Sequence, residues 1–404
     1  MCDPIRRGLL VALTLLLTAV PVAAAAPATP APVVAADSSL AAMLRLLPAF
    51  PLATAELDYA DYARQRHAFG LDERPQTDAE TQLQSAVLSE LVTPFDADLS
   101  APGWKEGLGF DRWDIDQMLE FRDEDTSITI LRGRFDEAAL RRAWDRAGYQ
   151  PQQEAGLTFY ALGEDWDIDF DDPVSMLHFG SFSYFLLLDS DTIVGSATRA
   201  STDELIRVRA GQIPTMADEV GIAPLLSAVP PDLVTAILHD GSWLRFPADA
   251  AVIANNPNIA AGTREAVATR IANDQIEATR MPPILTVLAG FTAGGPTGFG
   301  AVATPIPVAA DAPIAHDVAV ATMGSTEAAG TAASVAADRL EKEAPRSSDF
   351  ARRPYVDLFP TRTVQVVPGQ PVVLVDLVPA PDVPASAVCT LIGGQDLTFL
   401  LWLP

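Results

Sequence analysis

The stretch SITILRGRFDEAALRRAWDRAG, residues 127–148, decides the fold class, because it joins a strand pattern directly to a helix pattern. Its first part is rich in β-branched and apolar residues, which is typical of a strand. Its second part opens at Asp136, a common helix N-cap residue, and closes at Gly148, a residue that often terminates helices. We therefore expect a strand, a short cap and a helix in immediate succession.

The segments that follow continue this alternation. The sequence GLTFYAL (156–162) predicts a strand, and SYFLLLDSDTIVGSAT (183–198) predicts a hairpin with an Asp-Ser-Asp turn. The sequence STDELIRVRAG (201–211) predicts a helix that opens with a capping box from Ser201 to Glu204. The predicted order is therefore β-α-β-β-β-α.

Two helices are expected before this unit. The segment TDAETQLQSAVLSEL (77–91) opens with a capping-box pattern and places its leucines on one face. The segment DRWDIDQMLEF (111–121) has apolar residues at a similar helical spacing.

The C-terminal half repeats the same logic. The stretch AVATMGSTEAAGTAAS (319–334) is again a strand, a polar cap at Ser325 and a helix with a small-residue face. A further strand is expected within 282–294, and a hairpin within 363–379. We therefore predict an α+β protein of two related ferredoxin-like-type units, with largely antiparallel sheets and helices on one face.

The domain organisation follows from composition. Residues 1–26 combine Arg6 and Arg7 with an apolar run and small residues, which predicts a signal peptide. An uncleaved membrane anchor is the alternative, since the apolar run is long enough to cross a bilayer. Residues 27–39 form a Pro/Ala linker, 40–210 an acidic α+β unit, and 211–404 a second α+β unit.

The charge limits the partners that the protein can have. The formal net charge is −26, so nucleic acid and anionic lipid surfaces are repelled, and we expect no membrane contact beyond the N-terminal segment. Cys389 is the single cysteine after the predicted signal, which excludes an internal disulfide in the mature chain, and we expect it to be buried.

The run EDWDIDFDD (164–172) is the most acidic stretch of the chain. Its acids alternate with Trp166, Ile168 and Phe170, which predicts a half-buried strand with a solvated acidic face. An EF-hand is excluded, because its sixth and twelfth positions require Gly and Glu. A different calcium site remains the alternative, and its ligands would be Asp165, Asp167, Asp169 and Asp171.

Other candidate chemistry is weak. The four histidines lack metal-ligand spacing, and no nucleophile-elbow or zinc-protease motif occurs. Arg352 and Arg353 in RRPYVDLFP (352–360) are candidates for binding an anionic ligand, although the aromatic residues of this segment favour a loop anchored on the core. Paired carboxylates for a hydrolase cannot be chosen from so many acids.

We therefore expect an exported bacterial protein of the extracellular space, periplasm or cell envelope. No cofactor is expected, apart from the calcium alternative. The absence of a catalytic motif favours a non-catalytic binding or scaffolding module for a protein partner or a small apolar ligand. The two alternatives are a calcium-stabilised surface domain and a hydrolase that uses paired carboxylates.

Overall fold

The computed structural model of the 404-residue chain describes residues 39–52, 55–68, 74, 103–123, 125–166, 168–169, 171, 175, 178, 180–240, 260–265, 269, 284–292, 316–345, 350, 353–383, 387–393 and 400. Residues Ala36–Pro404 form one compact unit. The predicted signal peptide, the linker before Ser39 and the predicted helix at 77–91 lie outside the described residues. No described helix is both long and apolar enough to cross a membrane.

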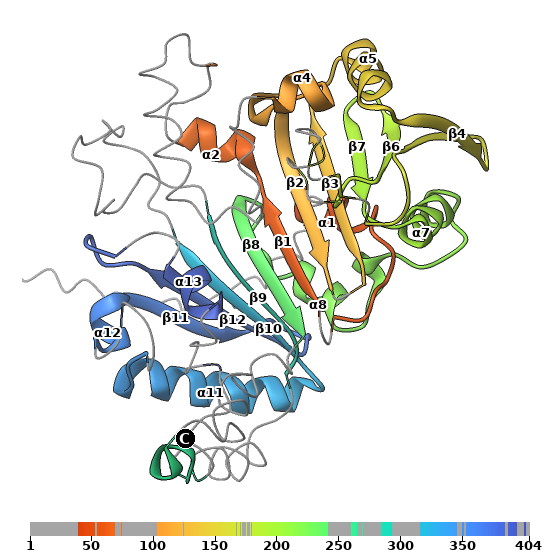
Figure 1. The fold of residues 1–404 in the computed structure, drawn as a ribbon. Coiled ribbons are helices and arrows are strands. Elements are labelled where there is room, and N and C mark those ends of the chain that lie inside the picture. Colours follow the sequence, from red (N-terminus) through yellow and green to blue (C-terminus); the bar gives the residue numbers. More distant parts are fainter. Residues whose placement is uncertain are drawn as a thin grey trace, which may run out of the picture. The chain divides into compact units, whose positions relative to one another are not determined.

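The protein is a mixed α+β fold with one large antiparallel sheet of twelve strands (Figure 1). The strand order is β11-β12-β10-β9-β8-β1-β2-β3-β7-β6-β5-β4. The strands are β1 Glu56–Ala60, β2 Ile115–Arg122, β3 Ser127–Gly133, β4 Gln150–Glu154, β5 Leu157–Ala161, β6 Tyr184–Asp189, β7 Thr192–Ser196, β8 Leu233–Asp240, β9 Ile284–Thr292, β10 Asp317–Met323, β11 Thr361–Val366 and β12 Val372–Val378.

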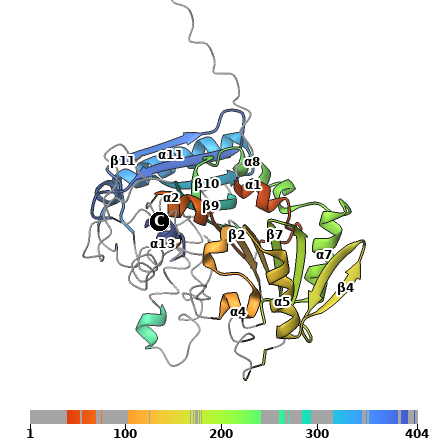
Figure 2. The ribbon, with the colours of Figure 1, turned by 90° about the horizontal axis from the view of Figure 1, so that it is seen from above.

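Helices accompany the sheet, and the longest described one is α11 with 17 residues. The helices are α1 Ser39–Leu44, α2 Tyr62–Ala68, α4 Trp104–Leu108, α5 Glu137–Ala147, α7 Arg199–Arg209, α8 Ile222–Leu226, α11 Thr326–Lys342, α12 Tyr355–Leu358 and α13 Ala387–Gly393, with 3-10 turns η1 Arg112–Asp114 and η2 Met216–Asp218. Figure 2 shows α11 alongside β11 at one end of the sheet and β4 at the other end.

The two halves of the sheet have a common strand plan. In the first half the neighbours β1, β2 and β3 are followed by α5, and the chain returns so that β7 pairs with β3. In the second half the neighbours β8, β9 and β10 are followed by α11, and the chain returns so that β12 pairs with β10. The halves join where β1 pairs antiparallel with β8, so one sheet replaces the two that were expected.

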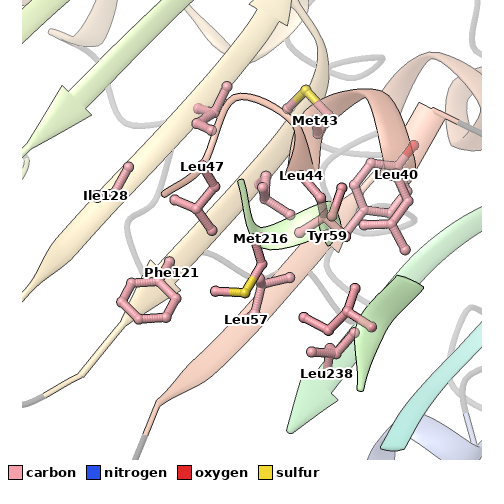
Figure 3. Packing of buried hydrophobic residues seen from close by; sticks show 14 of the residues in the cluster. Leu40, Met43, Leu44, Leu47, Leu57, Tyr59, Phe121, Ile128, Met216 and Leu238 are labelled. Carbon is pink, nitrogen blue, oxygen red and sulfur yellow. The ribbon is translucent and has the colours of Figure 1, made fainter. Parts of the chain in front are cut away.

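Helices cover both faces of the sheet, not one face as expected. On one face, α1 residues pack with Leu57 and Phe121 in a large buried cluster (Figure 3). On the other face, Met118 and Leu131 pack with Leu140 of α5. The expectation failed because neighbouring residues of these strands are buried on opposite sides, which requires a hydrophobic cover on each.

The opening stretch of sequence folds as predicted. Residues Ser127–Gly133 form β3, and the Asp136 side chain caps α5 by accepting a hydrogen bond from the Ala139 backbone N–H at 3.1 Å. Gly148 ends the helix with a φ of 92°, a left-handed conformation that glycine adopts without strain. Trp144 of α5 stacks on Phe185 of β6 with ring centroids 4.7 Å apart, which fixes the helix on the sheet.

The second strand–helix unit is also confirmed. Ser325 caps α11, and Ala329, Ala332 and Ala336 are buried against the C-terminal strands. Small side chains let the helix axis approach the sheet closely, as the pattern predicted.

One helix prediction was wrong, and a second predicted helix was confirmed with a different start. Residues 111–121 form η1 and most of β2 instead of a helix, because Met118 and Leu119 are buried on opposite faces of a sheet covered on both sides. The α7 helix begins at Arg199, before the predicted capping box, because the Thr198 side chain accepts a hydrogen bond from the Ser201 backbone N–H.

Candidate functional site

Polar side chains occupy one face of the neighbouring strands β1, β2 and β3. We name this group the polar band, and it consists of Asp58, Glu120, Arg122, Ser127 and Thr129. Asp58 is the register partner of Glu120, Glu120 is the partner of Thr129, and Arg122 is the partner of Ser127. Register partners in antiparallel strands point to the same face, so these side chains are contiguous.

The carboxyl groups of the polar band are buried, and its cation reaches solvent. Asp58 and Glu120 are each 4% exposed. The Arg122 Nη2 atom lies 3.6 Å from Asp58 Oδ2, and its Nε atom lies 3.7 Å from Glu120 Oε1. The Arg122 side chain is 36% exposed, so the polar band opens to water at the guanidinium.

The two hydroxyl groups of the polar band lack hydrogen bonds within the described part of the chain. Ser127 Oγ and Thr129 Oγ1 are both buried without a partner there. An unsatisfied buried hydroxyl costs about 1–3 kcal/mol in proteins. These hydroxyl groups can therefore donate to, or accept from, a group that enters the polar band.

A second acidic position comes from the C-terminal half. The Asp317 carboxyl on β10 accepts a hydrogen bond from the Val388 backbone N–H of α13 at 3.1 Å. Burial raises the pKa of the Asp317 carboxyl well above its ordinary value. Cys389 is buried as predicted; burial, and then the charges of Asp317 and Asp58, raise the pKa of its thiol. Cys389 thus lies within electrostatic reach of acids from both halves.

The start of α2 lies close to the polar band. Burial raises the pKa of the Tyr62 hydroxyl, nearby Arg112 opposes the rise, and the charges of Glu120 and Asp58 add to it. Asp61, just before the helix, accepts a hydrogen bond from the Arg64 backbone N–H at 2.9 Å. Asp61 therefore has a structural role as the α2 cap.

His239 of β8 is on the same face as Asp58. Its neighbour Ile237 is the register partner of Asp58, and the side chain two residues further along points to the same side. Burial lowers the pKa of His239 to about 4, while a hydrogen bond with the Ala55 backbone opposes the shift. The imidazole is therefore neutral at neutral pH and adds no positive charge to this face.

The acidic run 164–172 does not form the predicted strand in its described residues. Trp166 has a φ of 56° and is 39% exposed instead of pointing inward. The reason is local: Asp165 Oδ1 accepts hydrogen bonds from Tyr184 Oη and the Arg199 backbone N–H, each at 2.8 Å. Side chains that bind nearby groups in this way compete with strand pairing.

The four candidate calcium ligands are only partly described. Asp165, Asp169 and Asp171 are exposed, and Asp167 lies outside the described residues. Asp169 Oδ1 accepts a hydrogen bond from the Asp171 backbone N–H at 2.9 Å. In the described ranges no group of three or more His, Cys, Asp or Glu residues is placed to hold a metal ion.

The candidate anion site is paired within the protein. Arg353 forms a two-pronged ion pair with Asp382, with N–O distances of 2.8 and 3.0 Å, and holds the pKa of that carboxyl below its ordinary value. Arg352 lies outside the described residues. Tyr355, Leu358 and Phe359 are buried, as expected for a segment anchored on the core.

Sequence reasoning missed the polar band. Its one visible signal is Glu120 between Leu119 and Phe121, a charged residue inside an apolar run. No protein-family model matches the chain, nor does any curated protein or solved structure.

Proposed function

We propose that the chain is an exported bacterial envelope protein that binds a small polar ligand, without catalysis, at the polar band. The observation that carries this proposal is the buried pair Asp58 and Glu120, which is bridged by an Arg122 that reaches solvent. Two hydroxyl groups without a hydrogen-bond partner among the described residues flank this pair. Buried polar groups with one end in water are suited to recognise a small ligand by hydrogen bonds.

The chemistry of the neighbouring groups favours binding over catalysis. A nucleophilic thiol requires a lowered pKa, whereas burial raises the pKa of Cys389. A histidine base operates best with a pKa near the working pH, whereas the pKa of His239 is lowered to about 4. These two groups therefore lack the properties of a nucleophile and a general base.

A melting-temperature screen of the full chain tests the proposal. Sugars, amino acids, amines, lipids and divalent cations are added one at a time, and a ligand that binds the folded state raises the midpoint. Thr129→Val removes a hydroxyl group without changing the side-chain shape, so it should preserve folding and weaken binding of the ligand at least about tenfold.

Thr322→Val is the matched control, because Thr322 Oγ1 is also buried without a described partner but lies on β10, outside the polar band. Equal ligand affinity in the two variants would place binding elsewhere. A protein partner, or a small apolar ligand as first expected, would appear as a midpoint shift that Thr129→Val leaves unchanged.

A hydrolase with paired carboxylates is the second candidate, because Asp58 and Glu120 are direct register partners. Cβ atoms of such partners lie about 4.5–5.5 Å apart, close to the carboxyl separation of about 5–5.5 Å in retaining glycosidases. Hydrolysis of chromogenic glycosides that disappears in both Asp58→Asn and Glu120→Gln would support it, and an inactive wild-type chain would refute it.

Two further expectations remain proposals. The shared strand plan supports two related units of ferredoxin-like type, with 40–210 and 211–404 as their bounds, and separate hydrogen-exchange behaviour of the halves would test it. Calcium binding by Asp165, Asp167, Asp169 and Asp171 predicts a melting midpoint that falls with chelator and recovers with calcium but not with sodium. An unchanged midpoint would exclude it.

A further inference from the structure

The two edges of the twelve-stranded sheet differ in their protection. At one edge, β4 contains Pro151, which lacks a backbone N–H, and its Glu154 is ion-paired with Arg199. At the other edge, β11 has the sequence TRTVQV, which contains no proline and one charged residue, Arg362, whose side chain is paired with Glu341. Proline and charge are the usual devices that block an exposed strand from pairing with another chain.

The hydrogen bonding of the hairpin shows which β11 groups point outward. The Val367 backbone N–H donates to the Val372 carbonyl at 2.9 Å, which makes these two residues a hydrogen-bonded pair. Hydrogen-bonded positions alternate along an antiparallel strand. Thr363 and Gln365 therefore direct their backbone groups toward β12. Arg362, Val364 and Val366 direct theirs away from β12, where the described residues contain no further strand.

We propose that β11 pairs antiparallel with β11 of a second copy of this chain, about a twofold axis at Val364. In this register Val364 faces Val364 of the second copy, and Arg362 faces Val366 of the second copy. All three outward-directed residues then exchange backbone hydrogen bonds, because each meets another outward-directed residue. A shift of the axis to Thr363 would leave Val366 without such a partner.

The side chains are compatible with this register. Thr363 would lie opposite Gln365 of the second copy on one face, where both side chains are exposed and able to hydrogen-bond. On the other face, Arg362 is held by Glu341 and by the Phe359 carbonyl, so its charge does not oppose the approach of a second strand. Val364 and Val366 are half-buried against the core cluster of α11.

Long-range charge opposes the pairing. The formal net charge of −26 repels a second copy, and salt screens this repulsion over about 8–10 Å near physiological ionic strength. Dimer formation should therefore strengthen as salt concentration rises, in contrast to an interface held by opposite charges.

Sedimentation of the full chain is the first test. The wild-type chain should dimerise at concentrations up to about 100 μM, and Val364→Pro should weaken the dimer at least about tenfold by removing one outward N–H. Gln153→Pro is the control at the opposite edge: like Pro151, position 153 directs its backbone N–H away from β5, so this change should leave dimerisation unchanged. A wild-type chain that stays monomeric at these concentrations would overturn the proposal.

Cysteine trapping keeps the proposal testable if Val364→Pro fails to fold. In a Cys2→Ser background, Val364→Cys should form a disulfide-linked dimer with oxidised glutathione, because facing Cα atoms lie about 5.5 Å apart. Thr363→Cys is the matched control, since its two copies would be about 8 Å apart and outside disulfide range. Equal trapping of the two variants would exclude the register.

Discussion

Asp58 of β1 lies directly opposite Glu120 of β2, and both residues are 4% exposed. Like charges in facing positions of a sheet are destabilising, and burial increases the effect. Arg122 lies within 3.7 Å of both carboxyl groups and compensates for part of this repulsion. The stability of the sheet centre therefore depends on a residue that is itself partly in water.

Replacement of this cation gives the first prediction. Arg122→Met should lower the free energy of unfolding by about 1–3 kcal/mol at pH 7, less than for a fully buried pair because Arg122 is 36% exposed. Urea unfolding at pH 7 measures this effect. Arg134→Met, at a 68% exposed side chain, should change stability by less than about 0.5 kcal/mol.

Asp317 gives a prediction on the alkaline side. Burial raises the pKa of this carboxyl in the folded state above the ordinary value of 3.8. The contribution of Asp317 to the free energy of unfolding is therefore fully present below pH 3.8 and is lost as pH rises through the folded-state pKa. Asp317→Asn should therefore be more stable than wild type at neutral pH, by about 1.4 kcal/mol for each pKa unit of the shift. If wild type and Asp317→Asn showed the same pH dependence in urea unfolding, the claim that burial raises the pKa of Asp317 would be wrong.

His239 gives the opposite slope. Burial lowers its pKa from 6.5 to about 4, so stability is present above pH 6.5 and falls as pH drops toward 4. The free energy of unfolding of the wild-type chain should fall by on the order of 3 kcal/mol between pH 6.5 and pH 4 because of this histidine, and His239→Gln should abolish that fall. Thermal unfolding between pH 4 and pH 7 provides the measurement, with His67→Gln at an exposed side chain as control. A wild-type profile unchanged by His239→Gln would rule out this contribution.

Two glycine substitutions test the packing, one in each half of the protein. A Cβ atom at Gly195 would lie 2.2 Å from Phe182 Cδ1, so Gly195→Ala should destabilise by about 1–3 kcal/mol. A Cβ atom at Gly330, on the exposed side of α11, would meet nothing within 4 Å. Gly330→Ala should therefore stabilise by about 0.5–1 kcal/mol, and calorimetry distinguishes the signs.

The predicted elements that were confirmed have strong local signals. The α5 helix has Asp136 and Gly148 at its ends, and β6 and β7 flank a turn of acidic and hydroxyl residues. Where tertiary burial overrides the local pattern, prediction failed. The β2 strand is buried on both faces, so apolar and polar residues do not alternate along it, and its pattern predicted a helix. The β4 strand is polar and was not predicted because it lacks apolar residues.

The polar band could not be predicted for a related reason. Asp58 and Glu120 are far apart in sequence, and only the register between β1 and β2 brings them together. Acidic residues are numerous, so their presence in a strand pattern carries no information about burial. The pairing of β1 with β8 is equally non-local, which explains why two separate sheets were expected where one exists.

The seam between β1 and β8 sets the order of events as the polypeptide emerges during synthesis. Until Leu233–Asp240 has been made, β1 has an open side, and the nascent first half carries a bare edge. Closing it joins positions separated by well over a hundred residues, a slow step by topology alone. Chaperone capture should therefore be most valuable to this chain in the interval before Asp240 leaves the ribosome.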